Sequence, residues 1–447
     1  MRKATFHRGI HPPTNKALTA SCPIREIPCG DIAIYPLAGG MGAPAEPVVA
    51  KGDQVKAGQM LAQAKGFFSL SVYSGVSGTV KAVEYRPGHN GLNTMCVVVE
   101  NDQQYTMAEA WDQPRDPSTM TADEIRAAIQ KAGIAGMGGA GFPMHVKLAP
   151  PEGTKIDHVI LNGAECEPYL TADDRLMREQ SDHIVRGLEI LLRLFPEAEG
   201  VIAIEDNKTE AIEAMRRAVE GKDRMRVQPL VTKYPQGGER MLIHAVTGRD
   251  VDSSRLPAHV GCVVSNVAST AAVEDAVVYG KPVIKRVMTV SGDGIEKPDN
   301  LLVPIGTQFK DVIAACGGAK EATKKYISGG PMMGTAVFDL DVPVMRTSSG
   351  LLAFTEDPVA KHAPSPCIRC GKCVAACPEG LLPQQLAIAA THMDYARFAE
   401  LHGMECILCG SCAYVCPANR PLTQCMMDGR QAVREKRHIP KNERKEG

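Results

Sequence analysis

The sequence predicts a multidomain α/β protein with a small all-β module, an α/β layer with a mostly parallel sheet, a small α+β module and a cysteine-rich helical end. Three observations predict this class. Short alternating runs separated by glycines fill residues 31–105, strand and helix periods alternate over residues 118–282, and eight of the 15 cysteines fall within residues 367–416. A chain of 447 residues is long enough for roughly two to four domains with their own cores.

Composition and charge exclude several classes of protein. The 50 basic and 51 acidic residues give a net charge of -1, so the charge gives no case for a nucleic-acid partner. The start, MRKATFHRGIHPP, lacks an apolar signal region, and no later stretch reaches the roughly 18 apolar residues of a membrane helix. We therefore expect neither secretion nor a membrane span, and a reducing cytoplasm fits the clustered cysteines.

The first module reads as closely spaced strands joined by glycine turns. Its runs KGDQVKAGQMLA and VSGTVKAV resemble the two halves of a lipoyl or biotinyl carrier sandwich. A carrier needs a lysine at the tip between these halves, where residues 66–69 read GFFS. We therefore expect a relative of the carrier that carries no prosthetic group and serves in docking.

A predicted helix leads into a glycine loop, GMGGAGFP, at residues 136–143. Thr121 and Glu124 form a capping box at the start of this helix, and Gly133 follows its end. The glycine spacing fits the G-x-G-x-x-G dinucleotide fingerprint, but that fingerprint must be entered from a strand, because its glycines turn a strand end into a helix. The preceding helix therefore excludes a Rossmann loop.

Two cysteine runs near the end of the chain carry the most specific signal. Each reads C-x₂-C-x₂-C-x₃-C-P, the ligand run of bacterial two-cluster ferredoxins, in which the fourth cysteine of one run binds the other cluster. Two structural zinc sites are the alternative. We assign one [4Fe-4S] cluster to Cys367, Cys370, Cys373 and Cys416, and the second to Cys406, Cys409, Cys412 and Cys377.

The clusters change the interpretation of the glycine loop. A nicotinamide exchanges two electrons at once as a hydride, whereas a [4Fe-4S] cluster takes one. A flavin placed between them would solve this mismatch, because it can accept two electrons and release them singly. The glycine loop is therefore better interpreted as a flavin site.

The residues around this loop carry a family resemblance. GMGGAGFPMHVKL and LNGAECEP resemble the flavin loops of the NADH-oxidising flavoprotein subunit of respiratory complex I, and YPQGGE and SNVAST are similar to two further segments of that subunit. The complete order, from GIHPP and the carrier-like sandwich to the two cysteine runs, resembles the RnfC family, whose members are subunits of the Rnf electron-transport complex.

This resemblance implies an order of parts along the whole chain. We expect an N-terminal extension (1–30), a lipoyl-like barrel-sandwich module (31–105), an FMN- and NADH-binding α/β domain (118–282), a β-grasp module of the SLBB type (283–340), a linker (341–360), an α-helical two-cluster ferredoxin domain (361–425) and a solvated basic tail (426–447).

The resemblance also implies the residues of an FMN and NADH pocket. The flavin would be held by backbone and polar groups of Gly136, Gly138, Gly139, Gly141, Lys147, Asn162, Tyr234, Gly237 and Asn266. NADH would stack on Phe142 and hydrogen-bond to Glu167 and Glu239, with Glu165 beside them, although Glu165 or Glu167 could instead cap the next helix. No catalytic side chain is expected, because FMN itself would take the hydride. Ala164 and Gly238 depart from the complex I pattern, where both positions hold acids.

The implied function is that of a peripheral electron-transfer subunit on the cytoplasmic face of the cell membrane. It would exchange electrons between NAD(H) and ferredoxin, or a ferredoxin-like subunit, and reach the membrane only through partner subunits of an Rnf complex. Two alternatives remain open. A flavin-dependent cobalamin reductase of the propanediol-utilisation type shares these motifs but carries its sandwich after the clusters, and a non-catalytic electron wire would retain a vestigial nucleotide pocket.

Overall fold

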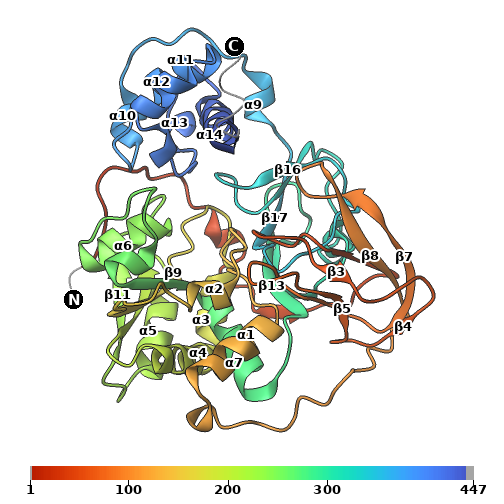
Figure 1. Ribbon diagram of the computed structural model, residues 1–447. Helices are drawn as coiled ribbons and strands as arrows, with labels where there is room; N and C mark the ends of the chain where they lie inside the picture. Colours follow the sequence, from red (N-terminus) through yellow and green to blue (C-terminus); the bar gives the residue numbers. More distant parts are fainter. Residues whose placement is uncertain (1–2, 439–447) are drawn as a thin grey trace.

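The computed structural model describes residues 3–438 and shows four successive modules packed around one another (Figure 1). The cysteine-rich helices, drawn in blue, lie at one end of the molecule, next to the green α/β domain and the cyan strands of the β-grasp module. No helix among the residues described is long and apolar enough to cross a membrane.

The first module is a sandwich of two small sheets, as the glycine-punctuated runs predict. Along its long β8 strand, Val97 and Val99 face the sandwich core, whereas Cys96 and Val98 pack on the opposite face, which is the period of two expected for a strand. One sheet has the order β2 (Ile32–Pro36), β8 (Asn93–Asn101), β7 (Gly78–Pro87) and β4 (Gln54–Val55), and the other has the order β3 (Glu46–Pro47), β5 (Met60–Gln63) and β6 (Val72–Tyr73).

The α/β domain contains the predicted parallel sheet. Its order is β11 (Met225–Leu230), β10 (Glu199–Glu205), β9 (His158–Gly163) and β12 (Cys262–Asn266), and every pairing is parallel. Because β9 and β12 are parallel neighbours in register, Asn162 and Asn266 lie opposite each other at the carboxyl edge of the sheet, where loops form binding sites in α/β folds.

Helices cover this sheet and supply most of its apolar core. The continuous helical pattern of residues 174–195 forms two helices, because the chain breaks at Gln180, whose φ of -132° is not helical. The helices are α1 (Ala122–Lys131), α2 (Met144–Lys147), α3 (Ala172–Glu179), α4 (Ser181–Leu194), α5 (Thr209–Ala218), α6 (Glu239–Thr247) and α7 (Val267–Tyr279).

The β-grasp module is a six-stranded sheet completed by segments from outside the predicted boundaries. Its order is β1 (Ile24–Glu26), β14 (Asp299–Pro304), β13 (Lys285–Ser291), β17 (Gly350–Phe354), β15 (Lys325–Ser328) and β16 (Thr335–Val337), with α8 (Phe309–Ala315) packed on it. The prediction of a linker at 341–360 is therefore wrong over β17, which is buried between β13 and β15, and the N-terminal extension supplies an edge strand.

The last module is helical. The helical pattern of residues 383–401, between the cysteine runs, is broken after Thr391, and Asp394 caps the second helix by accepting a hydrogen bond from the Arg397 N–H. The basic tail begins as helix, with Met426 and Val433 buried, and the part beyond 438 lies outside the described residues. The helices are α9 (Pro358–Lys361), α10 (Lys372–Ala376), α11 (Pro383–Thr391), α12 (Tyr395–Glu400), α13 (Ser411–Tyr414) and α14 (Leu422–His438).

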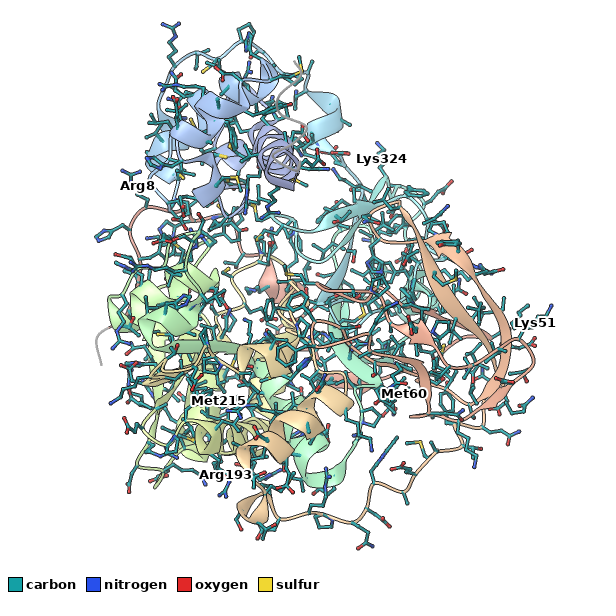
Figure 2. The ribbon with its side chains drawn as sticks, in the orientation of Figure 1. Arg8, Lys51, Met60, Arg193, Met215 and Lys324 are labelled. Carbon is teal, nitrogen blue, oxygen red and sulfur yellow. The ribbon has the colours of Figure 1, made fainter. Side chains whose placement is uncertain are left out.

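The N-terminal segment ties the α/β domain to the last module. It pairs with the α/β domain through the bridges Ala4–Leu230 and Ile10–Tyr234. Between them, Arg8 reaches the cysteine-rich helices, where its guanidinium donates a hydrogen bond to the Val374 carbonyl at 3.3 Å (Figure 2). The carboxyl edge of the parallel sheet is thereby brought beside the cysteine runs.

Candidate functional site

The glycine loop is entered from a helix, as predicted. Thr121 and Glu124 form both hydrogen bonds of the capping box, and Gly133 follows the helix end with a φ of +68°. The loop then closes on itself, because the Gly136 N–H donates to the Phe142 carbonyl at 2.8 Å. The loop is thus a rigid backbone turn placed over the start of α7 and the edge of the sheet.

The predicted flavin glycines differ in what surrounds them. A Cβ on Gly139 would meet no atom within 4 Å, so Gly139 faces open space, whereas a Cβ on Gly138 would contact Asn266 at 3.5 Å. A Cβ on Gly141 would lie only 2.8 Å from the Gly40 Cα and 2.9 Å from the Thr347 methyl group. Gly141 therefore lacks a side chain because the sandwich module packs on it.

Several predicted residues line one small cavity beside the loop. Lys147 is shared between two acceptors there, donating to Glu239 Oε1 at 2.7 Å and to the Val264 carbonyl at 3.2 Å. The cavity is lined by Gly136, Phe142, Met144, Lys147, Leu148, Val263, Val264, Ser265, Asn266 and Ser269. A cation, an aromatic ring and the backbone of one glycine, Gly136, therefore meet at this cavity, and these groups suit an anionic flavin nucleotide.

Asn162 and Gly237 are also brought together. The Asn162 side-chain amide donates to the Gly237 carbonyl at 2.8 Å and accepts from the Ala164 N–H at 3.2 Å. The Gly237 N–H lies 3.3 Å from the sulfur of Cys166, a half-buried residue, and desolvation raises the pKa of this thiol. Ala164 and Cys166 make this wall of the site less polar than the complex I pattern.

Glu165 takes the alternative role, that of a helix cap. Its carboxylate accepts hydrogen bonds from the Asp173 N–H at 2.7 Å and the Asp174 N–H at 3.3 Å, in the first turn of α3. A carboxylate there offsets the exposed N–H groups and the positive end of the helix dipole. Its charge is used within the fold, so the structure gives no support for a cofactor contact.

Glu167 is directed to the β-grasp module and does not line the glycine-loop cavity. Its two carboxylate oxygens accept hydrogen bonds from the Met332 N–H at 3.0 Å and the Met333 N–H at 2.9 Å. Burial raises the pKa of this carboxyl to about 7, although the two N–H donors and Lys16 act in the opposite direction. Glu167 therefore links the α/β domain to the β-grasp module, and its contact with NADH stays a prediction.

Tyr234 is fully buried and points toward the cysteine runs. Its hydroxyl donates a hydrogen bond to the Cys409 carbonyl at 2.7 Å, while its backbone pairs with Ile10. The ring packs in a small cluster that also contains Ala376 and Met332. Tyr234 thus forms a contact between the sheet edge and the second cysteine run, and its contact with the flavin stays a prediction.

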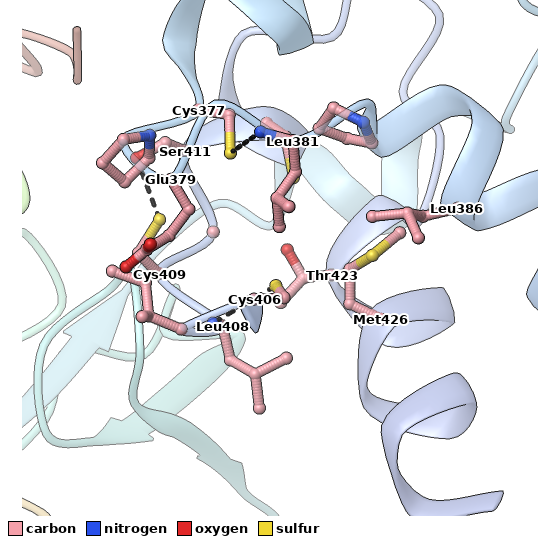
Figure 3. A pocket seen from close by; sticks show the side chains of 15 residues that line it. Cys377, Glu379, Leu381, Leu386, Cys406, Leu408, Cys409, Ser411, Thr423 and Met426 are labelled. Atoms are coloured by element: carbon pink, nitrogen blue, oxygen red, sulfur yellow. Dashed lines mark hydrogen bonds between the residues drawn. The ribbon is translucent and has the colours of Figure 1, made fainter. Parts of the chain in front are cut away.

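Four thiols from both cysteine runs surround one cavity, in the combination predicted for the second cluster. Figure 3 shows the thiols of Cys377, Cys406 and Cys409 directed toward the shared space, which Cys412 also lines. Backbone N–H groups of Leu381 and Leu408 lie 3.4 Å from the sulfurs of Cys377 and Cys406. Hydrogen bonds of this kind orient cluster ligands and tune cluster potentials.

Cys377 and Cys409 are buried, and Cys406 and Cys412 are half-buried. Desolvation raises the pKa of Cys406 to about 11 and that of Cys412 to about 12. A protonated thiol does not bind metal, so ligation at neutral pH requires iron to offset the cost of the buried thiolates. The sulfurs surround a space instead of converging on a point. Accordingly, within residues 3–438 no three His, Cys, Asp or Glu side chains are grouped for a single metal ion.

The other predicted set lies nearer the surface. Cys367 and Cys370 are exposed, and Cys373 is close enough to Cys416 for the two thiols to interact electrostatically. Both cysteine runs form the same turn: the third residue and the glycine after the second cysteine have positive φ, at Arg369 (54°) and Gly371 (75°) in one run, and at Leu408 (58°) and Gly410 (78°) in the other. The sequence repeat is therefore a structural repeat.

The first turn of α6 joins the two cavities. Glu239 holds Lys147 at the glycine loop, and the next residue, Arg240, forms ion pairs on both sides of the four-thiol cavity. Its partners are Glu405 at 2.9 Å, just before the second cysteine run, and Glu379 at 3.4 Å, just after the first. Arg240, like Gly40, was not found from the sequence. Its partner is 165 positions away, and no local pattern marks such a contact.

Comparisons with protein families match every module of the chain. The Nuo51 FMN-binding domain matches residues 129–275, the RnfC barrel sandwich hybrid domain matches 4–104, the SLBB domain matches 287–336 and the 4Fe-4S dicluster domain matches 366–420. These matches confirm the predicted fold class and its order of modules.

Relatives align over most of the chain. The C subunit of the proton-translocating ferredoxin:NAD(+) oxidoreductase complex of Clostridium ljungdahlii is 48% identical over 86% of this chain and 84% of that protein. The C subunit of the Na(+)-translocating complex of Acetobacterium woodii is 45% identical over 87% of each chain. The C subunit of the ion-translocating oxidoreductase complex of Rhodobacter capsulatus is 42% identical over 95% of this chain and 82% of that protein. The chain therefore belongs to the RnfC family, the C subunits of the ion-translocating ferredoxin:NAD+ oxidoreductase (Rnf) complexes.

Proposed function

We propose that this chain is the peripheral electron-transfer subunit of a membrane-bound, ion-translocating ferredoxin:NAD+ oxidoreductase. It exchanges electrons between NAD(H) and ferredoxin or partner subunits through FMN and two [4Fe-4S] clusters. The observation that carries this proposal is the first turn of α6, where Glu239 binds Lys147 of the glycine-loop cavity and Arg240 binds Glu405 beside the four-thiol cavity. The first turn of α6 thus fixes the proposed flavin site, which handles two electrons, next to the proposed cluster site, which handles one.

The residues around the glycine loop fit a flavin nucleotide. The absence of a side chain at Gly139 leaves open space beside the loop, and Lys147 supplies positive charge at the cavity. Bound FMN supplies hydride chemistry with NADH and single-electron chemistry with a cluster. The protein places Phe142 and Lys147 at the cavity and holds Asn162 and Asn266 at the sheet edge behind it.

The two cysteine sets have different surroundings, and we assign them different positions in the path. Cys377, Cys406, Cys409 and Cys412 lie beside Tyr234 and Arg240, at the junction with the α/β domain. In the other set, Cys367 and Cys370 are exposed. The buried set therefore receives electrons from the flavin side, and the exposed set faces the ferredoxin-like partner.

We assign the chain to the cytoplasmic face of the cell membrane, held there by other subunits of the complex. Two relatives are named as ion-translocating, one for protons and one for Na(+), and in our proposal the ion pathway belongs to partner subunits. NADH and ferredoxin are cytoplasmic electron carriers, which supports this side of the membrane.

The test is anaerobic reconstitution of the purified chain with iron, sulfide and FMN, followed by NADH. We expect NADH to bleach both flavin and cluster absorbance in the wild type and in Cys425→Ser, a control at a cysteine outside both runs. Cys377→Ser is expected to keep flavin reduction and to lose about half of the bound iron.

The same reconstitution distinguishes the proposed function from the alternative of a non-catalytic electron wire. If neither the wild type nor Ala164→Asp retains FMN, or if NADH leaves the bound flavin oxidised in both, the chain acts only as a wire. Ala164→Asp restores the acid of the complex I pattern on the wall formed with Asn162 and Gly237.

A further inference from the structure

The tip of the sandwich module, residues 66–69, lies against the glycine loop. Gly40, in the neighbouring turn of the sandwich, approaches Gly141 so closely that a Cβ on Gly40 would lie 2.5 Å from the Gly141 carbonyl oxygen. The Met41 N–H donates to the same carbonyl at 3.1 Å. In a carrier domain this tip would hold the prosthetic group, whereas here it is fixed beside a nucleotide-type loop.

The tip backbone is held by its own contacts. The Ala43 N–H donates to the Phe68 carbonyl at 2.9 Å, and the Ser69 hydroxyl donates to the Ala43 carbonyl at 2.9 Å. His145, from α2, lies with its Nε2 2.7 Å from the Phe67 carbonyl oxygen. The position of the tip therefore does not depend on burying its aromatic rings.

Those rings remain largely uncovered. Phe67 is 59% exposed and Phe68 is 38% exposed, although they are neighbours on an ordered turn. The Phe68 ring packs on Phe142 with centroids 5.2 Å apart and planes at 77°, and the Phe67 ring packs edge-on against His145 at 5.2 Å. Phe68 and Phe142 thus form two walls of a corner whose open side faces solvent.

A planar heteroaromatic ring fits such a corner, because it can stack on one wall while meeting the other edge-on. Phe142 also lines the cavity that contains Lys147 and Asn266. A ligand seated there extends from the flavin-type cavity toward the sandwich tip. A nicotinamide dinucleotide has this chemistry, with flat bases at its two ends and negative charge between them.

We propose that Phe67 and Phe68 of the sandwich tip form the outer aromatic wall of the NAD(H) site, so that the carrier-like module contributes to substrate binding as well as to docking. This inference rests on the proposed function, because it places NAD(H) at the glycine loop. The tip positions the dinucleotide and takes no part in hydride transfer.

The test compares Phe67→Ala and Phe68→Ala with Phe338→Ala, a control that removes a more exposed ring from the β-grasp module. We expect the Kd for NAD+ and the KM for NADH of the FMN-loaded protein to rise about threefold to tenfold in the tip variants, with a smaller change in kcat. Phe68→Tyr is expected to restore the wild-type values. Hydrogen exchange at residues 66–69 should slow when NAD+ is added to the wild type.

An unchanged Kd for NAD+ in both tip variants would overturn the proposal, as would loss of FMN with unchanged NAD+ binding. The titration with NAD+ measures binding without electron transfer. Failure of the aromatic-wall proposal can therefore be distinguished from failure of the proposed function. If NADH does not reduce the wild-type flavin but the tip variants still weaken NAD+ binding, the proposed function fails and the aromatic wall stands.

Discussion

Replacement of Glu167 by Gln tests whether this carboxyl is a buried link between modules. In the wild type its two oxygens accept hydrogen bonds from the Met332 and Met333 N–H groups. A glutamine has one acceptor oxygen and turns its NH₂ group toward the other N–H. When both side chains are neutral, the variant therefore lacks one hydrogen bond, which is expected to cost about 1 kcal/mol.

The pH dependence gives the sharper prediction. The pKa of Glu167 is raised from 4.5 to about 7, so the contribution of its neutral form to stability is complete below pH 4.5 and is lost as the pH rises to 7. The total loss is about 3 kcal/mol, of which about 2 kcal/mol falls between pH 5.5 and 7. Glutamine does not titrate, so the variant becomes more stable relative to the wild type across this interval.

Hydrogen exchange of the Met332 and Met333 amides, corrected for intrinsic rates, measures the opening of this link. At pH 5.5 we expect faster exchange in Glu167→Gln than in the wild type. Between pH 5.5 and pH 8, the exchange rate of the variant divided by that of the wild type should fall by about 30-fold. Glu124→Gln, at an exposed carboxylate in the capping box of α1, should leave both amides unchanged. A ratio that stays constant between pH 5.5 and 8 would refute the reasoning.

Three further substitutions test the contacts between modules. Gly141→Ala would place a Cβ 2.8 Å from Gly40, so limited proteolysis should release the sandwich module. The control Gly221→Ala has a φ of +77° and no neighbour within 4 Å, so thermal melts should show only about 1–2 kcal/mol of backbone strain. Arg240→Ala should weaken the packing of the cysteine-rich helices on the α/β domain by about 1 kcal/mol and speed proteolytic cleavage of the segment that connects them. Arg397→Ala, which breaks an exposed ion pair within the cysteine-rich module, should leave the cleavage rate unchanged. Equal cleavage rates in the two variants would contradict this prediction. Tyr234→Phe leaves the Cys409 carbonyl without its donor, so stopped-flow absorbance should show slower cluster reduction at an unchanged KM for NADH, and an unchanged cluster rate would argue against this contact as part of the path.

The sequence by itself determined the parts of this protein whose chemistry is local. Ligand spacing within each cysteine run and the capping box of α1 depend on residues a few positions apart, and both are found in the structure as predicted. The alternation of strands and helices predicted the parallel sheet for the same reason. The helix before the glycine loop was sufficient to exclude a Rossmann turn.

Only the tertiary structure decided which of these parts meet. Glu167 and Tyr234 belong to segments that resemble a flavin site, yet their partners are Met332, Met333 and Cys409, more than 160 positions away in the chain. The edge strand β1 and the central strand β17 lie outside the predicted β-grasp boundaries for the same reason. The local sequence around a hydrogen-bond donor or an exposed ring does not predict its partner, because the packing of whole modules brings the donor or ring and its partner together.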